Sequence, residues 1–288
     1  MYEAFFGLRE NPFNLSPDPK YLYSSSHHSE ALNHLIYGIL EKKGFIVITG
    51  EIGIGKTTIC RSLLSSLGQA VASALIFNSF ISDLELLETV NQEFGIPMKG
   101  VRRSKKRYID LLNTFLLENF SAGRNAILLI DEAQNLSHGV LEQIRMLSNL
   151  ETETEKLIQI ILVGQPELHG MLALPALRQL NERITVRYHL SPLQHEEVHL
   201  YIQHRLAVAG SGDKLQFSPG AYRLIYRHSQ GIPRRINAIC DRASLIAYTE
   251  ESLTISTRIV REAVKDLGKP FYADSSGNRT PWYRRALF

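Results

Sequence analysis

A glycine-rich string in the first quarter of the chain has the spacing that holds phosphate groups. Gly50-Glu51-Ile52-Gly53-Ile54-Gly55-Lys56-Thr57 matches the pattern G-x-x-x-x-G-K-[ST], and Thr58 follows it. Glycines let successive backbone N–H groups turn toward the phosphates, and the following helix contributes the positive end of its dipole. The lysine of such a loop reaches the β- and γ-phosphates, and the threonine hydroxyl binds Mg²⁺. Residues 50–58 are therefore predicted to bind ATP, with Lys56 on the phosphates and Thr57 on the metal ion.

Two acidic residues follow an apolar run later in the chain. Asp131 and Glu132 come directly after Ala126-Ile-Leu-Leu-Ile130. A strand in this position delivers a carboxylate to the carboxyl edge of a parallel sheet, where ligands bind in such folds. We expect Asp131 to hold Mg²⁺ through water, and Glu132 to orient and deprotonate the water that attacks the γ-phosphate. The alternative, a pair of solvated acids after a strand, is less favoured because residues 50–58 precede them.

A glutamine after the next apolar run is a further candidate. Gln165 follows Leu157–Gly164 and precedes Pro166. Its side chain could contact the γ-phosphate and the attacking water. The alternative is a turn residue that caps a helix.

Three arginines are candidates for contacts with the nucleotide. Arg178 and Arg183 precede the last apolar run, and they could act as arginine fingers on a neighbouring subunit's phosphates or be plain surface residues. Arg234 lies beside Arg235 where Gly231-Ile-Pro-Arg-Arg-Ile-Asn237 opens a helix. A helix N-terminus disfavours cations, so the position mildly favours a role for Arg234 or Arg235 at the nucleotide.

The elements that must position these residues follow from the apolar pattern. Short β-branched runs, typical of buried parallel strands, occupy 45–49, 72–77, 126–130, 157–163 and 184–188. Helical patterns lie at 29–42, 56–67, 84–94, 108–120, 140–150 and 174–183. Strands that alternate with helices indicate an α/β fold with three layers and a parallel sheet. After Pro192 the pattern is helical, at 194–209, 219–228, 233–248 and 257–266.

We therefore expect four parts along the chain. They are an N-terminal loop segment (1–28), a nucleotide-binding α/β domain (29–190), a helical lid domain (191–267) and a flexible basic tail (268–288). The N-terminal segment is rich in Pro, Asn, Ser and aromatic residues, a composition that favours an ordered loop over a helix.

The composition is that of an ordinary globular protein. The chain has 288 residues, 44% of them hydrophobic, and a net charge of +3, which demands neither a nucleic acid nor a membrane as partner. Cys60 and Cys240 are far apart, and the adjacent pair His27-His28 has no further ligand at metal-binding spacing. No run of about 18 apolar residues predicts a membrane span, and no secretory signal opens the chain.

Several strings together resemble the AAA+ ATPases: GEIGIGKTT, ILLIDEAQNL, ILVGQPEL and GIPRRIN occur in that order. More closely, the chain is similar to the general secretion pathway protein A family, on the strings MYEAFFGLRENPFNLSPDPKYLY, GQPEL and LRQLNERITVRYHL. The resemblance covers about residues 1–266. It implies a P-loop NTPase (AAA+) fold with a helical lid, Gln165 as sensor 1, Arg234 as sensor 2, and Arg178 and Arg183 as finger candidates.

The resemblance also implies a cellular role. It suggests a homo-oligomer that hydrolyses ATP to drive or switch the assembly of a bacterial envelope complex for secretion, pilus formation or polysaccharide export. The expected location is the cytoplasm, with peripheral association with the inner membrane as an option. Larger members carry a transmembrane segment and a periplasmic peptidoglycan-binding region after the ATPase, and neither is found here. Arg279, Trp282, Tyr283, Arg284 and Arg285 would suit a membrane-facing stub, although a disordered basic tail is the plainer interpretation.

Other functions remain to be weighed. Six of the nine residues in Lys99–Arg107 are basic, which would suit a DNA-acting AAA+ ATPase such as a transposition helper. We favour a solvated loop and helix start, because no helix-turn-helix or zinc module accompanies the run. The string Asp131-Glu-Ala-Gln134 also suggests a helicase. A helicase of this kind needs a second motor domain, and the remaining residues look helical, so this function is disfavoured. A switch with negligible turnover is disfavoured by the presence of Lys56, Asp131 and Glu132.

Overall fold

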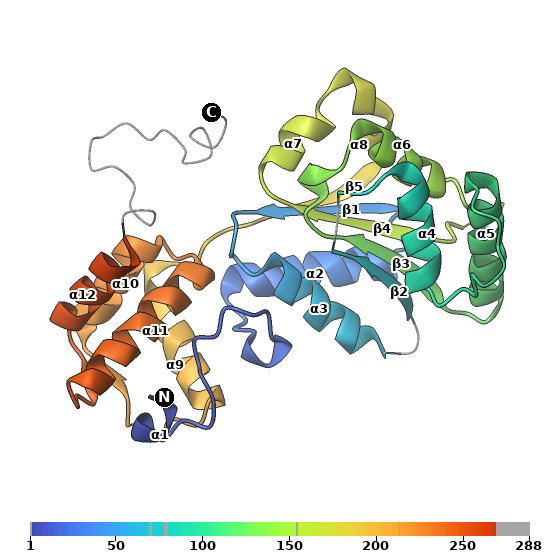
Figure 1. Ribbon diagram of the computed structural model, residues 1–288. Coiled ribbons are helices and arrows are strands. Elements are labelled where there is room, and N and C mark those ends of the chain that lie inside the picture. Colours follow the sequence, from blue (N-terminus) through green and yellow to red (C-terminus); the bar gives the residue numbers. More distant parts are fainter. Residues whose placement is uncertain (1, 69–70, 78–79, 154, 213, 269–288) are drawn as a thin grey trace. The chain divides into compact units, whose positions relative to one another are not determined.

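The computed structural model describes residues 2–68, 71–77, 80–153, 155–212 and 214–268, and the chain divides into two compact units (Figure 1). One unit is Pro17–Ser191, and the other combines Met1–Ser16 with Pro192–Phe288. The part predicted to be a flexible basic tail, 268–288, lies outside the described residues except for Gly268, as do Arg279 and Trp282–Arg285.

The unit Pro17–Ser191 is built on a five-stranded sheet. Its strands are β1 (Phe45–Gly50), β2 (Val71–Ile76), β3 (Asn125–Ile130), β4 (Gln159–Gly164) and β5 (Ile184–Leu190). They lie in the order β2-β3-β4-β1-β5, and each neighbouring pair is parallel. The predicted α/β fold with a parallel sheet is therefore confirmed, and each observed strand lies within about two residues of its predicted run.

Helices cover both faces of the sheet (Figure 1). On one face lie α2 (Ser26–Leu40) and α3 (Lys56–Leu67); on the other lie α4 (Asp83–Glu93), α5 (Lys105–Ser121), α6 (His138–Leu147), α7 (Glu167–Leu172) and α8 (Arg178–Arg183). The period-2 alternation of a strand divides β1 between the two cores: Ile46 and Ile48 pack with α2 and α3, and Phe45 and Val47 pack on the opposite face.

Short elements depart from the sequence-based prediction. Helix α2 begins at Ser26 because the Ser25 side chain accepts a hydrogen bond from the His28 backbone N–H and caps the helix early. Helix α7 was not predicted, because its six residues are too few to show a helical period; Pro166 is its N-cap residue. The helix expected over 174–183 starts as a 3₁₀ turn, η4 (Pro175–Leu177), and becomes α-helical only from Arg178.

The second unit is mainly helical. It contains α9 (His195–Val208), α10 (Pro219–Ser229), α11 (Pro233–Thr249) and α12 (Thr257–Leu267), close to the predicted ranges. It also contains two elements absent from the prediction: a helix α1 (Glu3–Phe6) and a parallel pair of two-residue strands, β6 (Gln216–Phe217) and β7 (Thr254–Ile255).

The first residues of the chain are tied to these helices by polar contacts. Tyr2 Oη lies 2.5 Å from Asp241 Oδ1, and Asn11 Nδ2 donates to the same oxygen at 2.9 Å. The buried guanidinium of Arg205 donates to the carbonyl oxygens of Pro12 and Asn14. The sequence treats 1–28 as one loop segment, whereas residues 1–16 pack as part of the helical unit and residues 17–28 pack with the sheet.

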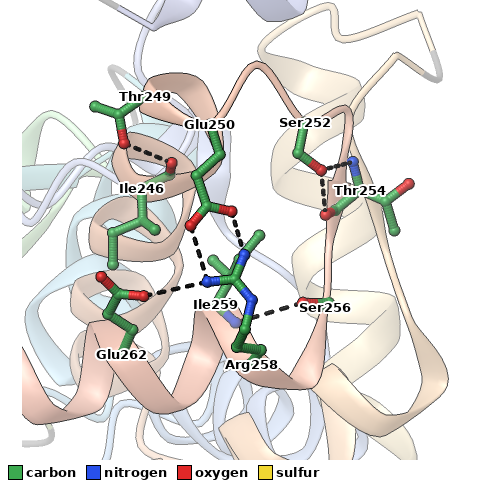
Figure 2. A network of polar contacts seen from close by, with 9 residues as sticks. All are labelled: Ile246, Thr249, Glu250, Ser252, Thr254, Ser256, Arg258, Ile259 and Glu262. Carbon is green, nitrogen blue, oxygen red and sulfur yellow. Dashed lines mark hydrogen bonds and ion pairs between the residues drawn. The ribbon is translucent and has the colours of Figure 1, made fainter.

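A network of polar contacts joins the end of α11 to the start of α12 (Figure 2). Arg258 Nη1 lies 2.9 Å from Glu250 Oε1 and 3.4 Å from Glu262 Oε2, and Arg258 Nη2 contacts the second oxygen of Glu250. The Ser256 side chain caps α12 by accepting from the Ile259 N–H. Exposed ion pairs contribute little to stability, so this network mainly fixes the geometry of the turn.

Among the residues that the structure describes, none of the helices combines the length and the apolar character that a membrane crossing requires.

Candidate nucleotide-binding site

The predicted site residues of the sheet unit meet at the carboxyl ends of three adjacent strands. Strand β1 leads into residues 50–58, β3 into Asp131 and Glu132, and β4 into Gln165. Because β3, β4 and β1 are neighbours in that order and all parallel, their ends share one edge of the sheet. The fold thus brings together polar groups that are more than 100 residues apart in sequence.

The backbone of the glycine-rich loop needs its glycines at specific points. Gly53 and Gly55 have φ angles of +79° and +108°, in the region that favours glycine. A Cβ atom on Gly50 would lie 2.9 Å from the Leu190 carbonyl oxygen, so the start of the loop has no room for a side chain. Ile54 is fully buried and anchors the loop in the core beneath it. Helix α3 then begins at Lys56, so its N-terminus faces the loop.

Lys56 is held within this loop. Its side chain is buried, and Nζ donates to the carbonyl oxygens of Gly50 at 2.7 Å and Glu51 at 3.1 Å. Burial lowers the pKa of Lys56 below its ordinary value, while the negative charges of Glu132 and Asp131 oppose that shift. Glu132 and Asp131, which follow β3, therefore favour the charged form of the Lys56 ammonium, and phosphate binding requires that form.

Thr57 and Asp131 make direct contact. The Thr57 hydroxyl donates to Asp131 Oδ2, and Asp131 Oδ1 accepts the Glu132 backbone N–H at 2.9 Å. Asp131 is buried, so its carboxylate is held by these partners rather than by bulk water. A hydroxyl and a carboxylate are the hard oxygen ligands that Mg²⁺ accepts, and this ion is commonly held by one or two protein groups with water and phosphate oxygens. The donor set fits Mg²⁺ bound with a nucleotide.

Glu132 lies in a network of two glutamines. Its Oε2 accepts hydrogen bonds from Gln134 Nε2 at 2.6 Å and from Gln165 Nε2 at 3.1 Å. The Gln165 backbone N–H donates to Gln134 Oε1 at 3.0 Å. Glu132 itself has a φ of +52°, a left-handed conformation that is uncommon for a residue other than glycine. The sequence analysis gave roles to Asp131 and Glu132 in the string ILLIDEAQNL but none to Gln134.

A buried histidine braces the glycine-rich loop from α2. His28 Nε2 lies 3.2 Å from the Ile54 carbonyl oxygen, and its Nδ1 lies 2.6 Å from Ser25 Oγ. A carbonyl oxygen can only accept, so the contact with Ile54 places a proton on Nε2. In the sequence analysis, His28 was considered only as part of a possible metal-binding pair with His27. Its contact with Ile54 was not predicted.

The two finger candidates differ in their surroundings. Arg178 has an 80% exposed side chain, and its Nε lies 2.9 Å from Glu182 Oε1. Arg183 Nη1 donates to Ser148 Oγ at 2.6 Å and to Asn149 Oδ1 at 2.5 Å, both just after α6. Arg183 thus fastens α8 to the end of α6, whereas Arg178 reaches outward.

Arg234 lies in the helical unit, exposed on the first turn of α11. The turn before it requires a glycine, since Gly231 has a φ of +73° and a Cβ there would lie 2.1 Å from the Leu193 carbonyl oxygen. The roles expected of Arg178, Arg183 and Arg234 stay predictions.

The basic run Lys99–Arg107 lies before and within the first turn of α5. Arg103 and Lys105 form ion pairs with Glu88 and Asp83, which belong to α4. Part of the positive charge of this run is therefore neutralised inside its own unit.

Known proteins resemble the chain in sequence and in fold. Residues 39–172 match the family described as "AAA domain". The chain is 49% identical over 252 residues to general secretion pathway protein A of Aeromonas hydrophila; the match covers 88% of this chain and 46% of that protein. The chain thus spans about half the length of this curated relative.

Solved structures with 16–18% identity share the fold alone. The Aeropyrum pernix ORC2 protein, in ADPNP-ADP complexes, gives a TM-score of 0.68 over 89% of this chain and 71% of its own. Cdc6p from Pyrobaculum aerophilum gives 0.67 over 92% and 70%, and the RuvB branch-migration motor of Thermotoga maritima gives 0.57 over 85% and 70%.

Proposed function

We propose that this chain, a member of the AAA+ ATPases that resembles general secretion pathway protein A, binds ATP with Mg²⁺ and hydrolyses it to ADP and phosphate. The observation that carries the proposal is the contact between the Thr57 hydroxyl and Asp131, beside Lys56 and Glu132 at one edge of the sheet. Three segments of the sequence supply a phosphate cradle, a metal-ligand pair and a base, which together form a site for phosphoryl transfer.

Each residue has a role that its chemistry allows. The backbone N–H groups of residues 50–58 and the ammonium of Lys56 hold the phosphates. Thr57 and Asp131 would hold Mg²⁺, which would supply positive charge against the negative charge of the phosphates. Glu132 takes a proton from the attacking water as its oxygen bonds to the γ-phosphorus and the bond to the bridging oxygen of ADP breaks. Gln165 orients this water and Glu132 together.

Arginines outside the sheet edge are proposed to supply further positive charge to the nucleotide phosphates. Arg178 projects outward and is released from an exposed ion pair at little cost, so it suits a finger that reaches a neighbouring copy's phosphates. Arg183 is a weaker candidate, because leaving Ser148 and Asn149 would break its hydrogen bonds. Arg234, in the lid domain proposed over 191–267, is proposed as a further cation for the nucleotide phosphates, as the resemblance implies.

The cellular role is proposed from the relative. Identity of 49% over 252 residues with general secretion pathway protein A supports an ATPase that drives or switches the assembly of a bacterial envelope complex. Its partner would be a protein of the secretion, pilus or polysaccharide-export machinery, met in the cytoplasm or at the inner membrane.

The proposal is tested by replacing the phosphate-binding cation. In a Lys56→Ala variant we expect ATP binding or turnover to be abolished, because the β- and γ-phosphates lose their charge partner. Phosphate release and binding of a fluorescent ATP analogue measure the two quantities. Lys106→Ala, an exposed lysine in α5, is the matched control. Wild-type turnover in a folded Lys56→Ala protein would rule out this site assignment.

A further inference from the structure

The side-chain amide of Gln134 bridges the ends of two strands. Its Nε2 lies 2.6 Å from Glu132 Oε2, after β3, and its Oε1 lies 3.0 Å from the backbone nitrogen of Gln165, after β4. The donor end and the acceptor end of the amide are thus both engaged. Gln165 Nε2 also donates to Glu132 Oε2 at 3.1 Å, so the three residues form a closed triangle of hydrogen bonds.

The position of Glu132 depends on such partners. Its backbone is left-handed, with φ at +52°, a conformation that is strained for a residue other than glycine and persists only where the surroundings enforce it. The Glu132 N–H is bonded to Asp131 Oδ1, which fixes the backbone. The two glutamine amides then fix the direction of the carboxylate. A base for hydrolysis needs this fixation, because a small misplacement of a catalytic group costs a large factor in rate.

The surrounding chain holds Gln134 itself in place. Gln134 lies in the 3₁₀ turn η3 (Ala133–Asn135), whose first residue, Ala133, is fully buried. Across from it, β4 ends in Gly164, where an added Cβ would lie 2.9 Å from Gln134 Oε1. A glycine at the end of β4 therefore leaves the space that the amide occupies. The ends of β3 and β4 lie close together because the two strands are hydrogen-bonded neighbours in the sheet.

We propose that Gln134 is a positioning residue that fixes the carboxylate of Glu132 against the backbone of Gln165 for ATP hydrolysis, an inference that rests on the proposed function. Glutamine suits this task for two reasons. It donates to a carboxylate and accepts from an N–H at the same time, which neither glutamate nor an aliphatic side chain does. Its amide is neutral, so it orients the carboxylate of Glu132 without adding a net charge to the site.

The triangle also links the base to strand β4. Gln165 holds Glu132 directly through its side chain and indirectly through its backbone N–H and Gln134. A displacement at the end of β4 therefore reaches the carboxylate by two routes. Gln134 is the group through which the backbone of this strand, rather than only its side chain, acts on the base.

Two substitutions of Gln134 test the proposal in the full chain. Gln134→Met keeps the approximate shape and removes both hydrogen bonds, so we expect kcat to fall about 10- to 100-fold, a part of what a general base contributes. The KM and the Kd for ATP should stay within about 3-fold, since Lys56 and Thr57 are untouched. Gln92→Met, on the exposed side of α4, is the matched control and should leave every quantity unchanged.

Gln134→Glu separates a positioning role from a purely structural one. This variant keeps an oxygen that accepts the Gln165 N–H, but it loses the donor and places a second negative charge beside Glu132. Because the amide donor to Glu132 is lost, we expect kcat to stay reduced about 10-fold or more while the Kd for ATP stays within about 3-fold of the wild type. If Gln134 served only to hold the end of β4 through the Gln165 N–H, the retained oxygen would restore kcat toward the wild-type value.

Three results would overturn the proposal. The first is a kcat for Gln134→Met equal to that of the wild type, and the second is a fall in ATP affinity in step with turnover. The third, which decides the matter if Gln134→Met does not fold, is a wild-type kcat for Gln134→Glu. If the wild-type chain itself fails to hydrolyse ATP, the proposed function falls too; if it hydrolyses ATP and the Gln134 variants match it, only this inference falls.

Discussion

His28 contacts the glycine-rich loop, although no pattern in the sequence indicates this contact. Its ring joins Ser25, at the start of α2, to the Ile54 carbonyl oxygen in the loop. It also lies 3.3 Å from the position that a Cβ on Gly55 would occupy. This histidine therefore restrains the loop at Ile54 and Gly55, in the segment proposed to bind phosphates.

We predict that His28→Ala weakens ATP binding more than it slows the chemical step. Loss of one buried hydrogen bond costs about 0.5–1.5 kcal/mol, so the KM for ATP should rise roughly 2- to 12-fold, while kcat changes less. Steady-state kinetics over a range of ATP concentrations measure both. His34→Ala, an exposed position on the same helix, serves as control. Equal effects of the two substitutions would show that His28 does not brace the loop.

The residues that the sequence identifies and those that it misses differ in how their partners are arranged. Lys56 and Thr57 stand in a contiguous string, and Asp131 follows an apolar run, so local pattern is enough to single them out. Gln134 and His28 acquire their roles through contacts with Gln165 and Ile54, which lie 31 and 26 residues away. No local pattern records such a contact.

At the scale of elements, the strands were the easiest part to predict. Runs such as Phe45–Gly50 and Gln159–Gly164 are buried along their whole length, so hydrophobicity alone defines them. Their order in the sheet places the ends of β3, β4 and β1 together, and the site follows from that order. The helices after Pro192 were similarly clear, because their caps and prolines mark where they begin.

Short elements were missed because they give too little periodic signal. Helix α7 has six residues, and strands β6 and β7 have two residues each. The N-terminal segment was misjudged for another reason. Its contacts join Tyr2 to Asp241 and Pro12 to Arg205, across about 190 to 240 residues of sequence, and composition alone could not place it with the helical unit.

For the whole molecule, we expect ATPase activity to depend on a second copy of the chain. In a Lys56→Ala protein mixed with an Arg178→Ala protein, one kind of interface joins an intact phosphate-binding loop to an intact arginine. An arginine finger contributes about 10³–10⁵ in kcat in related systems, so partial recovery of turnover in the mixture should be easy to measure. Specific activity of the wild type should likewise rise with protein concentration as subunits assemble.

Arg183→Ala provides the comparison. Because Arg183 bonds to Ser148 and Asn149, its loss should lower the midpoint of thermal unfolding, and mixing should not restore activity. Full activity of Arg178→Ala alone, or flat specific activity of a proven monomer, would contradict the trans arrangement. A partner protein would then be the expected activator.

The central claim, hydrolysis of ATP with Glu132 as base, is tested most directly by measuring ATP affinity and turnover on one preparation of Glu132→Gln. The amide keeps an oxygen that can accept from Gln134 and Gln165, so the shape of the site is preserved while its basicity is removed. We expect unchanged ATP affinity and hydrolysis reduced roughly 10²-fold or more, the scale of a lost general base. Glu118→Gln, exposed on α5, should match the wild type. Wild-type turnover in Glu132→Gln, or loss of affinity together with turnover, would rule out Glu132 as the base.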